Sequence, residues 1–437
     1  MQVEKELKAR LMAEMEAEIE KLLEEAGDRG TVTLSEIERA VEEAGRRIEQ
    51  RLIERLVAEA AEAQGQEQVH CPRCGGKLRY KGRKRRWVAT SRGEVEIERG
   101  YFYCETCRQG FFPLDERWEL TDSLYSPGLA QQMVWLSGML PSYEAAAEVF
   151  RRVSGRLLPA VSLWRQTQRY GERLAAYVKH QQEQVSPQRV VLPGSHEDHP
   201  RQKGVSLDGG MVNLRQEGWK EFKVGTVFDV EQRLERDPVT RELVEQPHGV
   251  HIAYTAVLGA VEQFAPALWA LAVRHAVPQA AHSSVTADGA AWIWNLAADY
   301  FPDSAQIVDW YHACQHLAEA ATALYPHDSQ AAQRWYQQRR DDLFQGHIHP
   351  ITLPLDRAGL SDQAHYFHTH QRRLQYQQFR EEGYPIGSGT VESGIKQFKA
   401  RMTGPGMRWN RPNAERMLVI RAAVLSGDFD HLWALAA

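Results

Sequence analysis

The sequence has no long apolar run and few cysteines. Among its 437 residues are five cysteines, and no segment approaches the roughly 20 consecutive apolar residues that a membrane-spanning helix needs. The most apolar stretch, 250–273, is interrupted by His251, Glu262 and Gln263. The first residues, MQVEKELKAR, contain no apolar signal core. We therefore exclude membrane, collagen-like and secreted disulfide-scaffold classes and expect a cytoplasmic protein.

A large excess of charge of one sign is also absent. The 53 basic and 58 acidic residues give a formal net charge of −5, and 43% of the residues are hydrophobic. This composition is typical of globular proteins and argues against a disordered chain. The length is enough for two to four domains of roughly 100–200 residues each. The overall charge does not indicate a nucleic-acid-binding protein, but two regions are locally basic.

Residues 1–66 form an N-terminal region with helical periodicity. Asp28-Arg29-Gly30 separates two apolar series, and we find two interpretations of them. The first is an antiparallel helix pair that covers part of a core, and the second is a dimerising coiled coil. The apolar positions with helical spacing are Leu7, Leu11, Met15, Ile19 and Leu22, then Ile37, Val41, Ala44, Ile48, Leu52 and Leu56.

Four of the five cysteines form two Cys-x-x-Cys pairs within residues 69–113. Cys71 and Cys74 make the first pair, and Cys104 and Cys107 make the second. Four thiolates on two tight turns can surround one Zn²⁺ tetrahedrally, and the residues between the pairs can form a β-hairpin. The spacing predicts a zinc ribbon with a structural zinc ion, in which the metal supplies much of the folding free energy.

The predicted hairpin is basic. Between residues 76 and 100 only three acids, Glu94, Glu96 and Glu98, oppose nine basic residues. This excess favours contacts with DNA phosphates, although a solvated hairpin face would explain it as well. The residues that we assign to DNA binding are Lys81, Arg83, Lys84, Arg85 and Arg86.

Residues 115–185 are predicted to be a helical domain of the helix-turn-helix type. Within it, 143–171 has the pattern of a helix, a turn at Ser154-Gly155 and a second helix. The second helix would either read DNA, with Arg165 and Arg169 in contact with it, or simply pack against its neighbours. Its polar and aromatic residues include Ser162, Trp164, Gln166 and Gln168.

The remaining chain changes to an α/β pattern after a polar segment, 186–203, that is predicted to be a linker. Three strands are followed by an alternation of helix and strand, and a charged insertion, 231–247, separates the second and third strands. This order predicts an α/β core within 204–425, in which residues 310–383 are helical. The predicted strands are 204–214, 219–230, 250–259, 282–287 and 304–309, and the main predicted helices are 261–275, 290–300 and 391–424.

Three acidic residues stand at similar places in this core. Asp208 follows an apolar strand stretch and Asp288 stands at a strand-to-helix junction, and each precedes glycine, while Glu392 stands in the first turn of a helix after Gly387-Ser388-Gly389. The glycines after Asp208 would leave room for a substrate or a hydrated ion. Three clustered carboxylates repel one another unless cations are bound, and their oxygens suit Mg²⁺ or Mn²⁺. Alternatively, Asp288 caps the next helix and Glu392 is a surface residue favoured by the helix dipole.

A second basic region follows Glu392. It contains Lys396, Lys399, Arg401 and Arg408 together with Trp409. This pattern favours a DNA-facing surface on which an aromatic ring stacks on a base, or else a salt-bridged amphipathic helix. Trp335, in the helical segment 310–383, could stack on an unpaired base, but packing in the core is the better interpretation.

The set of motifs resembles a DDE transposase of a bacterial insertion sequence. More narrowly, it resembles the Mutator-type group and its ISKra-type branch over about residues 69–425. The resemblance is carried by the contexts of Asp208, Asp288 and Glu392, by Asp309-Trp310-Tyr311-His312, and by the helical block 310–383. The segments Ile386-Gly387-Ser388-Gly389-Thr390-Val391-Glu392-Ser393 and Gly404-Pro405-Gly406-Met407-Arg408-Trp409 also belong to it.

The resemblance implies a multidomain α+β protein with an RNase H-like catalytic core and an all-helical insertion at 310–383. It implies that Asp208, Asp288 and Glu392 hold two Mg²⁺ or Mn²⁺ ions, and that DNA at the element ends is cleaved and joined to target DNA. Asp309 and His312 would lie near the site by the family pattern, or form a hydrogen-bonded pair facing the core. Asp309 also competes with Asp288 as the second acid, and we prefer Asp288. Double-stranded DNA, a homodimer or higher oligomer, and a location at the nucleoid follow from the resemblance.

Two other functions remain open from the sequence. A DNA-binding transcriptional regulator would use the ribbon and the helix-turn-helix and keep an inactive RNase H-like core. A metal-dependent nuclease would cut DNA without strand transfer. The three acids argue against the first alternative, and the separate modules before residue 186 argue against the second.

Overall fold

The structure of the chain is a computed structural model. It describes residues 2–25, 32–63, 69–121, 123–185, 202–236 and 243–436. The chain divides into two compact units, Met1–Met133 and Val134–Ala437. The predicted helix break at residues 28–30 and all but the last residues of the predicted linker 186–203 lie outside the described residues.

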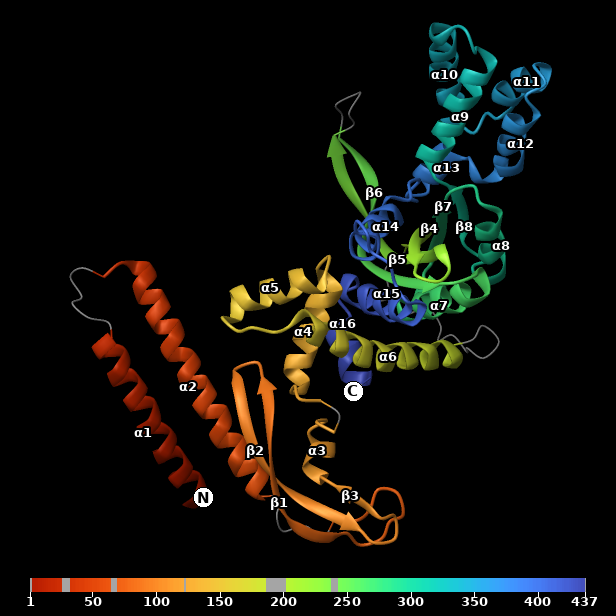
Figure 1. Cartoon of the computed structure of the whole chain (residues 1–437). Coiled ribbons are helices and arrows are strands. Elements are labelled where there is room, and N and C mark those ends of the chain that lie inside the picture. Colours follow the sequence, from red (N-terminus) through yellow and green to blue (C-terminus); the bar gives the residue numbers. More distant parts are fainter. Residues whose placement is uncertain are drawn as a thin grey trace. The chain divides into compact units, whose positions relative to one another are not determined.

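The first unit holds the predicted helical region and the cysteine module (Figure 1). Glu14 of the first helix forms an ion pair with Arg55 of the second, whereas Glu25, which is later in the first helix, pairs with Arg47, which is earlier in the second. The two helices therefore run antiparallel. A three-stranded antiparallel sheet follows, in the order β1-β2-β3. The elements are α1 (Gln2–Glu25), α2 (Leu34–Ala63), β1 (Arg79–Thr90), β2 (Gly93–Cys104), β3 (Gln109–Phe111), α3 (Pro113–Arg117) and the first turns of α4 (Pro127–Met139).

A small core joins α2 to the hairpin. Val88 and Ile97 are buried on the inner face of β1 and β2, together with Leu114 of α3. Val57 of α2 packs against this group. Alternate hairpin residues point inward because successive side chains of a strand lie on opposite faces, and this leaves the other face of the hairpin exposed.

The second unit is built around a mixed five-stranded sheet. The strand order is β6-β5-β4-β7-β8, with β4, β5 and β6 antiparallel and β4, β7 and β8 parallel. Its strands are β4 (Gln202–Leu214), β5 (Gly218–Arg236), β6 (Leu243–Leu258), β7 (His282–Ala287) and β8 (Ala305–Val308).

Helices precede, cover and interrupt this sheet. Two helices precede it, α5 (Tyr143–Ser154) and α6 (Ala160–Gln184), and α7 (Val261–Arg274), η2 (Val277–Gln279) and α8 (Ala291–Tyr300) connect strands. The helical insertion is α9 (Trp310–Leu324), α10 (Ser329–Phe344), α11 (His349–Arg357), α12 (Ser361–His370), η3 (Gln371–Arg373) and α13 (Tyr376–Glu381). The chain then forms α14 (Gly389–Met402), α15 (Arg411–Leu425) and α16 (Phe429–Ala436).

The charged segment predicted as an insertion is instead part of a long hairpin. β5 continues to Arg236 and β6 begins at Leu243, and the two remain paired from Glu231 with His248 to Arg236 with Leu243. Antiparallel pairing satisfies the backbone whatever the side chains are, so charged residues can extend a hairpin into solvent. The prediction of strand ends at 230 and 250 was therefore wrong.

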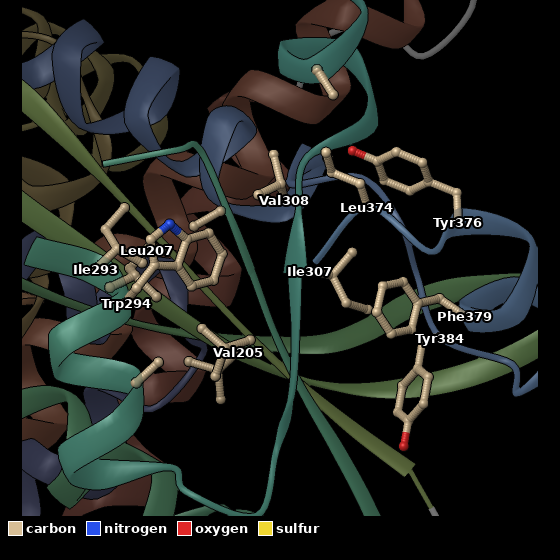
Figure 2. Packing of buried hydrophobic residues seen from close by; sticks show 14 of the residues in the cluster. Val205, Leu207, Ile293, Trp294, Ile307, Val308, Leu374, Tyr376, Phe379 and Tyr384 are labelled. Carbon is tan, nitrogen blue, oxygen red and sulfur yellow. The ribbon is translucent and has the colours of Figure 1, made fainter. Parts of the chain in front are cut away.

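Each face of the sheet packs against different helices. Val205 and Leu207 of β4 belong to a cluster with α7 and α8, and this cluster continues through Ile307 of β8 into the helical insertion. Figure 2 shows Trp294 of α8 on one side of β8 and Phe379 of α13 on the other. The opposite face of β4, β5 and β6 is covered by α14 and α15, through a second cluster.

The helical insertion stands between the last strand and α14. Helices α9 to α13 leave the sheet after β8 and return to it before α14, and Figure 1 shows α9 to α12 beyond one end of the sheet. None of the helices in the described ranges is long and apolar enough to cross a bilayer.

A tight contact fixes the height of α14 above the sheet. A Cβ atom at Gly394 would stand 2.7 Å from the ring of Tyr254 on β6, whereas a Cβ at Gly389 meets nothing within 4 Å. We predict that Gly394→Ala lowers the free energy of unfolding by about 1–3 kcal/mol, because the helix must move or the ring must leave its place.

Gly389→Ala is the matched control, and we expect it to leave stability unchanged or slightly raised. Urea denaturation of the two variants and the wild type measures the difference. Equal stability of the two variants would contradict this packing.

Candidate functional site

The four paired cysteines come together in the first unit. The sulfur of Cys71 lies 3.8 Å from that of Cys107, and the sulfur of Cys74 lies 3.6 Å from that of Cys104. All four sulfurs lie within 4.8 Å of one another. Sulfurs bound to one zinc ion at about 2.3 Å in a tetrahedron stand about 3.8 Å apart. The cluster could therefore bind zinc, and the three-stranded sheet beside it is compatible with a zinc ribbon.

The basic face of the hairpin is largely paired with acids of the neighbouring strand. Arg83 of β1 lies 3.5 Å from Glu98 of β2, and Arg85 lies 3.6 Å from Glu96. Lys84 is exposed on the other face, where its ammonium group stands 4.1 Å from the centre of the Tyr101 ring. Lys81 is exposed as well. Cross-strand pairing reduces the charge that this face offers to phosphates, although it leaves the side chains accessible.

Arg86 does not belong to this exposed face. Its guanidinium group is turned inward and lies 2.8 Å from the carboxylate of Asp115, which also accepts a hydrogen bond from Arg99. Asp115 belongs to α3 and is buried. The expectation that Arg86 contacts DNA was wrong, since this residue fastens α3 to the hairpin.

The predicted helix, turn and helix are present as α5 and α6. Gly155 ends α5 in the left-handed conformation, with φ of +70°, which favours glycine. However, Gln166 and Gln168 are buried in α6, as is Ser162. These polar residues pack inside the second unit and cannot read DNA in this structure, whereas Arg165 is exposed and Arg169 is half-buried.

Three aspartates lie at the same level of three neighbouring parallel strands. Leu207 of β4 pairs with Ala287 of β7, and Ala287 pairs with Val308 of β8. The next residue along the chain is in each case an aspartate: Asp208 within β4, Asp288 directly after β7 and Asp309 directly after β8. Because parallel strands end at one edge of a sheet, the register brings these carboxylates to one place.

Glu392 lies over the same face of the sheet as Asp208. Val224, the cross-strand partner of Asp208, belongs to the cluster beneath α14 that contains Val391 and Ile395. Side chains of directly paired residues share one face of a sheet. Glu392 stands in the first turn of α14, as the sequence predicts.

The glycines after Asp208 do not leave an open space. A Cβ at Gly209 would lie 2.4 Å from the carboxylate of Glu221, and a Cβ at Gly210 would lie 2.4 Å from the ring of Phe222. Side chains of β5 therefore fill the places that we expected a substrate or a hydrated ion to use. Gly210 serves to admit its cross-strand partner Phe222.

Asp309 is a buried link between the end of β8 and the start of α14. Its Oδ2 accepts hydrogen bonds from the backbone N–H of Ser388 at 2.6 Å and from the Ser388 hydroxyl at 2.9 Å. Its Oδ1 accepts from the backbone N–H of His312 at 2.8 Å, and the His312 ring nitrogen lies 3.3 Å away. The Ser388 hydroxyl lies 3.1 Å from Glu392. We call the bonds between Asp309 and Ser388 the Asp309–Ser388 link.

Asp309 and His312 are hydrogen-bonded to each other, and both also lie close to Glu392. Asp309 has no exposed surface, and its four contacts use most of the lone pairs that a carboxylate offers. Asp309 and His312 therefore form a hydrogen-bonded pair at a strand end. Asp309 positions the start of α14. Its oxygens also lie close enough to His312 and Glu392 for these three residues to hold one metal ion, so the preference for Asp288 as the second acid stays a prediction.

The electrostatics of the site connect the acids on the strands with α14. Burial raises the pKa of Asp208, and the nearby charge of Asp288 raises it further, against the effects of Gly209, His312 and Lys399. The hydrogen bond to Asp309 raises the pKa of His312, and the charges of Asp288 and Glu392 act in the same direction. Burial opposes the ionisation of Asp309, but hydrogen bonds from His312 and Ser388 outweigh it and lower its pKa.

Of the three acids predicted to bind Mg²⁺, only Glu392 belongs to a compact group of possible metal ligands among the described residues. Single ligand atoms of Asp309, His312 and Glu392 lie within 4.8 Å of one another, and Asp208 and Asp288 are not part of this group. Asp288 accepts a hydrogen bond from the N–H of Ala290, immediately before α8, at 2.9 Å. A site for two ions about 4 Å apart spreads its ligands more widely than a site for one. The three predicted acids thus share one edge of the sheet without forming a single-ion cage.

Two of the predicted DNA-binding residues after Glu392 are buried. Arg401 is 1% exposed and donates to the carbonyl of Ser137, near the end of α4. Trp409 is 7% exposed, and its ring N–H donates to the carbonyl of Met402. The assignment of both to a DNA-facing surface was wrong. Arg401 stabilises the negative end of the α4 dipole, and Trp409 packs in the cluster beneath α14.

The other basic residues of this region are accessible. Lys396 and Lys399 are exposed on α14, one and two turns after Glu392, and Arg408 is exposed in the following loop. Trp335 is buried in the helical insertion, as the preferred interpretation of the sequence holds.

Ser388 is the functional position that the sequence analysis missed. It is 3% exposed and precedes the first residue of α14. Ser388 is the residue before α14, but its side chain does not cap the helix. Its backbone N–H and its hydroxyl bind Asp309, which is 79 residues away in the chain, so no local pattern in the sequence could have indicated this contact.

Neither the models of protein families nor the curated proteins with which the chain was compared match it. The functional argument therefore rests on the geometry of this chain and on the motifs in its sequence.

We predict that the purified chain carries about one zinc ion, and that removal of the ion by a strong chelator unfolds the cysteine module. Cys104→Ser should lose the metal, whereas Cys314→Ala, which changes the fifth cysteine, should keep it. Elemental analysis gives the metal content, and limited proteolysis reports the fold of the module. A metal-free wild type that resists proteolysis would contradict the assignment.

We also predict that Asp309→Ala lowers the free energy of unfolding by about 1–3 kcal/mol, because it leaves the buried N–H of Ser388 without an acceptor. Asp303→Ala, at an exposed aspartate, should change it by less than about 0.5 kcal/mol. Urea denaturation measures both values. An Asp309→Ala variant as stable as Asp303→Ala would show that the link holds nothing in place.

Proposed function

We propose that the chain is a DDE transposase of an insertion sequence, a metal-dependent enzyme that cleaves DNA at element ends and joins it to target DNA. The observation that carries the proposal is that Asp208 and Asp288 each directly follow the last residue pair of the parallel β4–β7 ladder, Leu207 with Ala287. Asp208 lies on the sheet face that is covered by α14, and Glu392 stands in the first turn of that helix.

The topology of the second unit supports an RNase H-like core. Three antiparallel strands are followed by two strands parallel to the first, added on its other side. The helical insertion separates the last strand, β8, from the acidic helix, α14. Both features are those that the resemblance to transposases implies.

The residues of the site fit a pair of divalent cations. Asp208, Asp288 and Glu392 supply hard oxygen ligands, and like charge beside Asp208 disfavours its ionisation until a cation is bound. Two bound Mg²⁺ or Mn²⁺ ions would activate the attacking oxygen and stabilise the leaving one.

The reaction proceeds by direct attack at phosphorus. In cleavage, the oxygen of water forms a bond to phosphorus and the bond to the 3′ oxygen breaks, which leaves a 3′-hydroxyl and a 5′-phosphate. In joining, that 3′ oxygen attacks a phosphorus of the target and displaces the target's own 3′ oxygen. His312, whose pKa is raised chiefly by its hydrogen bond to Asp309, lies beside these carboxylates.

The chain's own residues position the acids and the DNA. The Asp309–Ser388 link holds the first turn of α14, so Glu392 is fixed relative to the end of β8. Lys396 and Lys399 follow on the exposed side of the same helix and are placed to neutralise phosphates. Arg408 in the second unit and Arg165 on α6 are further exposed cations.

The first unit supplies further candidate contacts. Lys81 and Lys84 are exposed, while Arg83 and Arg85 are shared with glutamates. We propose that this module, with its zinc ion, takes part in binding double-stranded DNA at the element ends. We also propose that the chain forms a homodimer or higher oligomer, which would hold two DNA ends of the element together.

We predict that Asp208→Asn, Asp288→Asn and Glu392→Gln each lower the rate of DNA cleavage at least about a hundredfold, because each removes charge that the metal ions require. Binding of the same DNA should be nearly unchanged. The assay combines labelled duplexes from the element ends, a supercoiled target and Mg²⁺, and it follows cleaved and joined products.

Asp303→Asn is the control for the same chemical change at an exposed site, and it should retain full activity. Full activity in any of the three site variants removes that residue from the site. Cleavage without joined products would support a nuclease, and binding without cleavage by the wild type would support a regulator.

A further inference from the structure

A hollow of about 900 Å³ lies beside the first residues of α14 and outside the three acids. It opens between the beginning of α9, helices α10 and α13 of the insertion, and β6. The residues that carry the argument are Trp310, Tyr311, Arg340, Arg380, Gly389 and Thr390. We call this space the Tyr311 hollow.

The Tyr311 hollow adjoins the carboxylate site directly. Tyr311 precedes His312 in the chain, and a Cβ atom built at Gly387 would lie 3.8 Å from the Tyr311 ring and 3.8 Å from Oδ2 of Asp309. The ring is therefore next to the Asp309–Ser388 link. A chain of nucleotides at the acids would pass within reach of this hollow.

The two aromatic residues at the start of α9, Trp310 and Tyr311, differ in how firmly they are packed. Trp310 is held in place, with its ring edge-on to Phe344 and Tyr376 at centroid distances of 5.6 and 4.8 Å. Tyr311 is 73% exposed, so most of its ring is accessible to a ligand in the hollow. An exposed ring beside a fixed wall offers a planar surface to a ligand that can stack.

The charges of the hollow suit a phosphate. Arg340 lies 5.8 Å from the centre of the Trp310 ring, and Arg380 donates to Gln246 and lies 5.9 Å from the Phe344 ring. Gly389 and Thr390, the first two residues of α14, line the same space, and the N-terminus of a helix carries a partial positive charge.

Acidic residues also line the hollow and limit the choice of ligand. Glu235 is paired with His248 at 3.1 Å, and Asp341 is exposed beside Arg340. A ligand of high negative charge is therefore disfavoured, and a group with one phosphate and a planar apolar face is favoured.

We propose that the Tyr311 hollow binds an unpaired nucleotide of the DNA substrate, with its base against Tyr311 and its phosphate near Arg340 and Arg380. The volume lies within the range of about 300–1,000 Å³ that small-ligand pockets occupy. A base inside a duplex has no free face to offer, whereas an unpaired base stacks on aromatic rings without sequence preference. This proposal rests on the proposed function, because it specifies a part of the same substrate.

The test compares the binding of two duplexes that differ only in a short single-stranded tail, with 2-aminopurine in the tail as a fluorescent reporter. No divalent cation is added, so cleavage does not occur. We expect the wild type to bind the tailed duplex about tenfold or more tightly than the blunt one and to quench the reporter.

Tyr311→Ala and Arg340→Ala should each remove most of the preference for the tail. Gly389→Leu should do so too, because a side chain at residue 389 enters open space without a clash. The matched controls are Tyr325→Ala and Arg334→Ala, which change a tyrosine and an exposed arginine of the insertion outside the hollow. Urea denaturation verifies that every variant is folded.

Three results would overturn the proposal: no preference for the tail in the wild type, a preference that survives all three hollow variants, or a free mononucleotide that competes as well as the tailed duplex. The last result would assign the hollow to a small nucleotide. A wild type that prefers tails but never cleaves would leave the hollow assigned and the transposase rejected. A wild type that cleaves without any preference would do the reverse.

Discussion

The hydrogen bonds between Asp309 and Ser388 are the interaction on which the candidate site depends. The helical insertion lies between these two residues, so the chain leaves the sheet at β8 and must return to the same place before α14 begins. A buried carboxylate that accepts a backbone N–H and a hydroxyl restricts this return closely, because any shift would leave polar groups unsatisfied in the interior. Glu392 lies four residues after Ser388, so the same hydrogen bonds also fix its position.

The link also explains how acids from distant parts of the chain come together at the sheet. Asp208 and Asp288 are brought together by the register of β4 and β7 alone. Glu392 comes from a helix whose apolar residues pack on β5 and β6, and whose tight contact at Gly394 sets its height above the sheet. Strand register therefore positions Asp208 and Asp288, and helix packing independently positions Glu392 at the same edge of the sheet. The Tyr311 hollow lies where the insertion adds a third wall.

Much of this arrangement follows from the sequence, and the reasons are local. Apolar runs that end in Asp-Gly indicate where β4 and β7 expose a carboxylate, and Gly-Ser-Gly before Glu392 indicates a helix start. The spacing of the cysteine pairs is specific enough to predict their convergence. What the sequence could not supply is burial, which depends on the whole fold. Arg86, Arg401 and Trp409 have the composition of a DNA-binding surface, yet each is turned inward to hold a helix or a strand. The charged extension of β5 and β6 was missed because charged residues were interpreted as the end of each strand. Backbone hydrogen bonds between the two strands are sufficient to continue the hairpin.

The central claim is that Asp208, Asp288 and Glu392 share divalent cations while Asp309 serves to position α14. A crystal of the chain soaked in Mn²⁺, with anomalous diffraction recorded near the manganese edge, tests this claim most directly. The account predicts manganese density between Asp208, Asp288 and Glu392, with the Asp309–Ser388 link intact. Manganese bound by Asp309, His312 and Glu392 with Asp208 and Asp288 free of metal, or no manganese at this edge of the sheet, would contradict it.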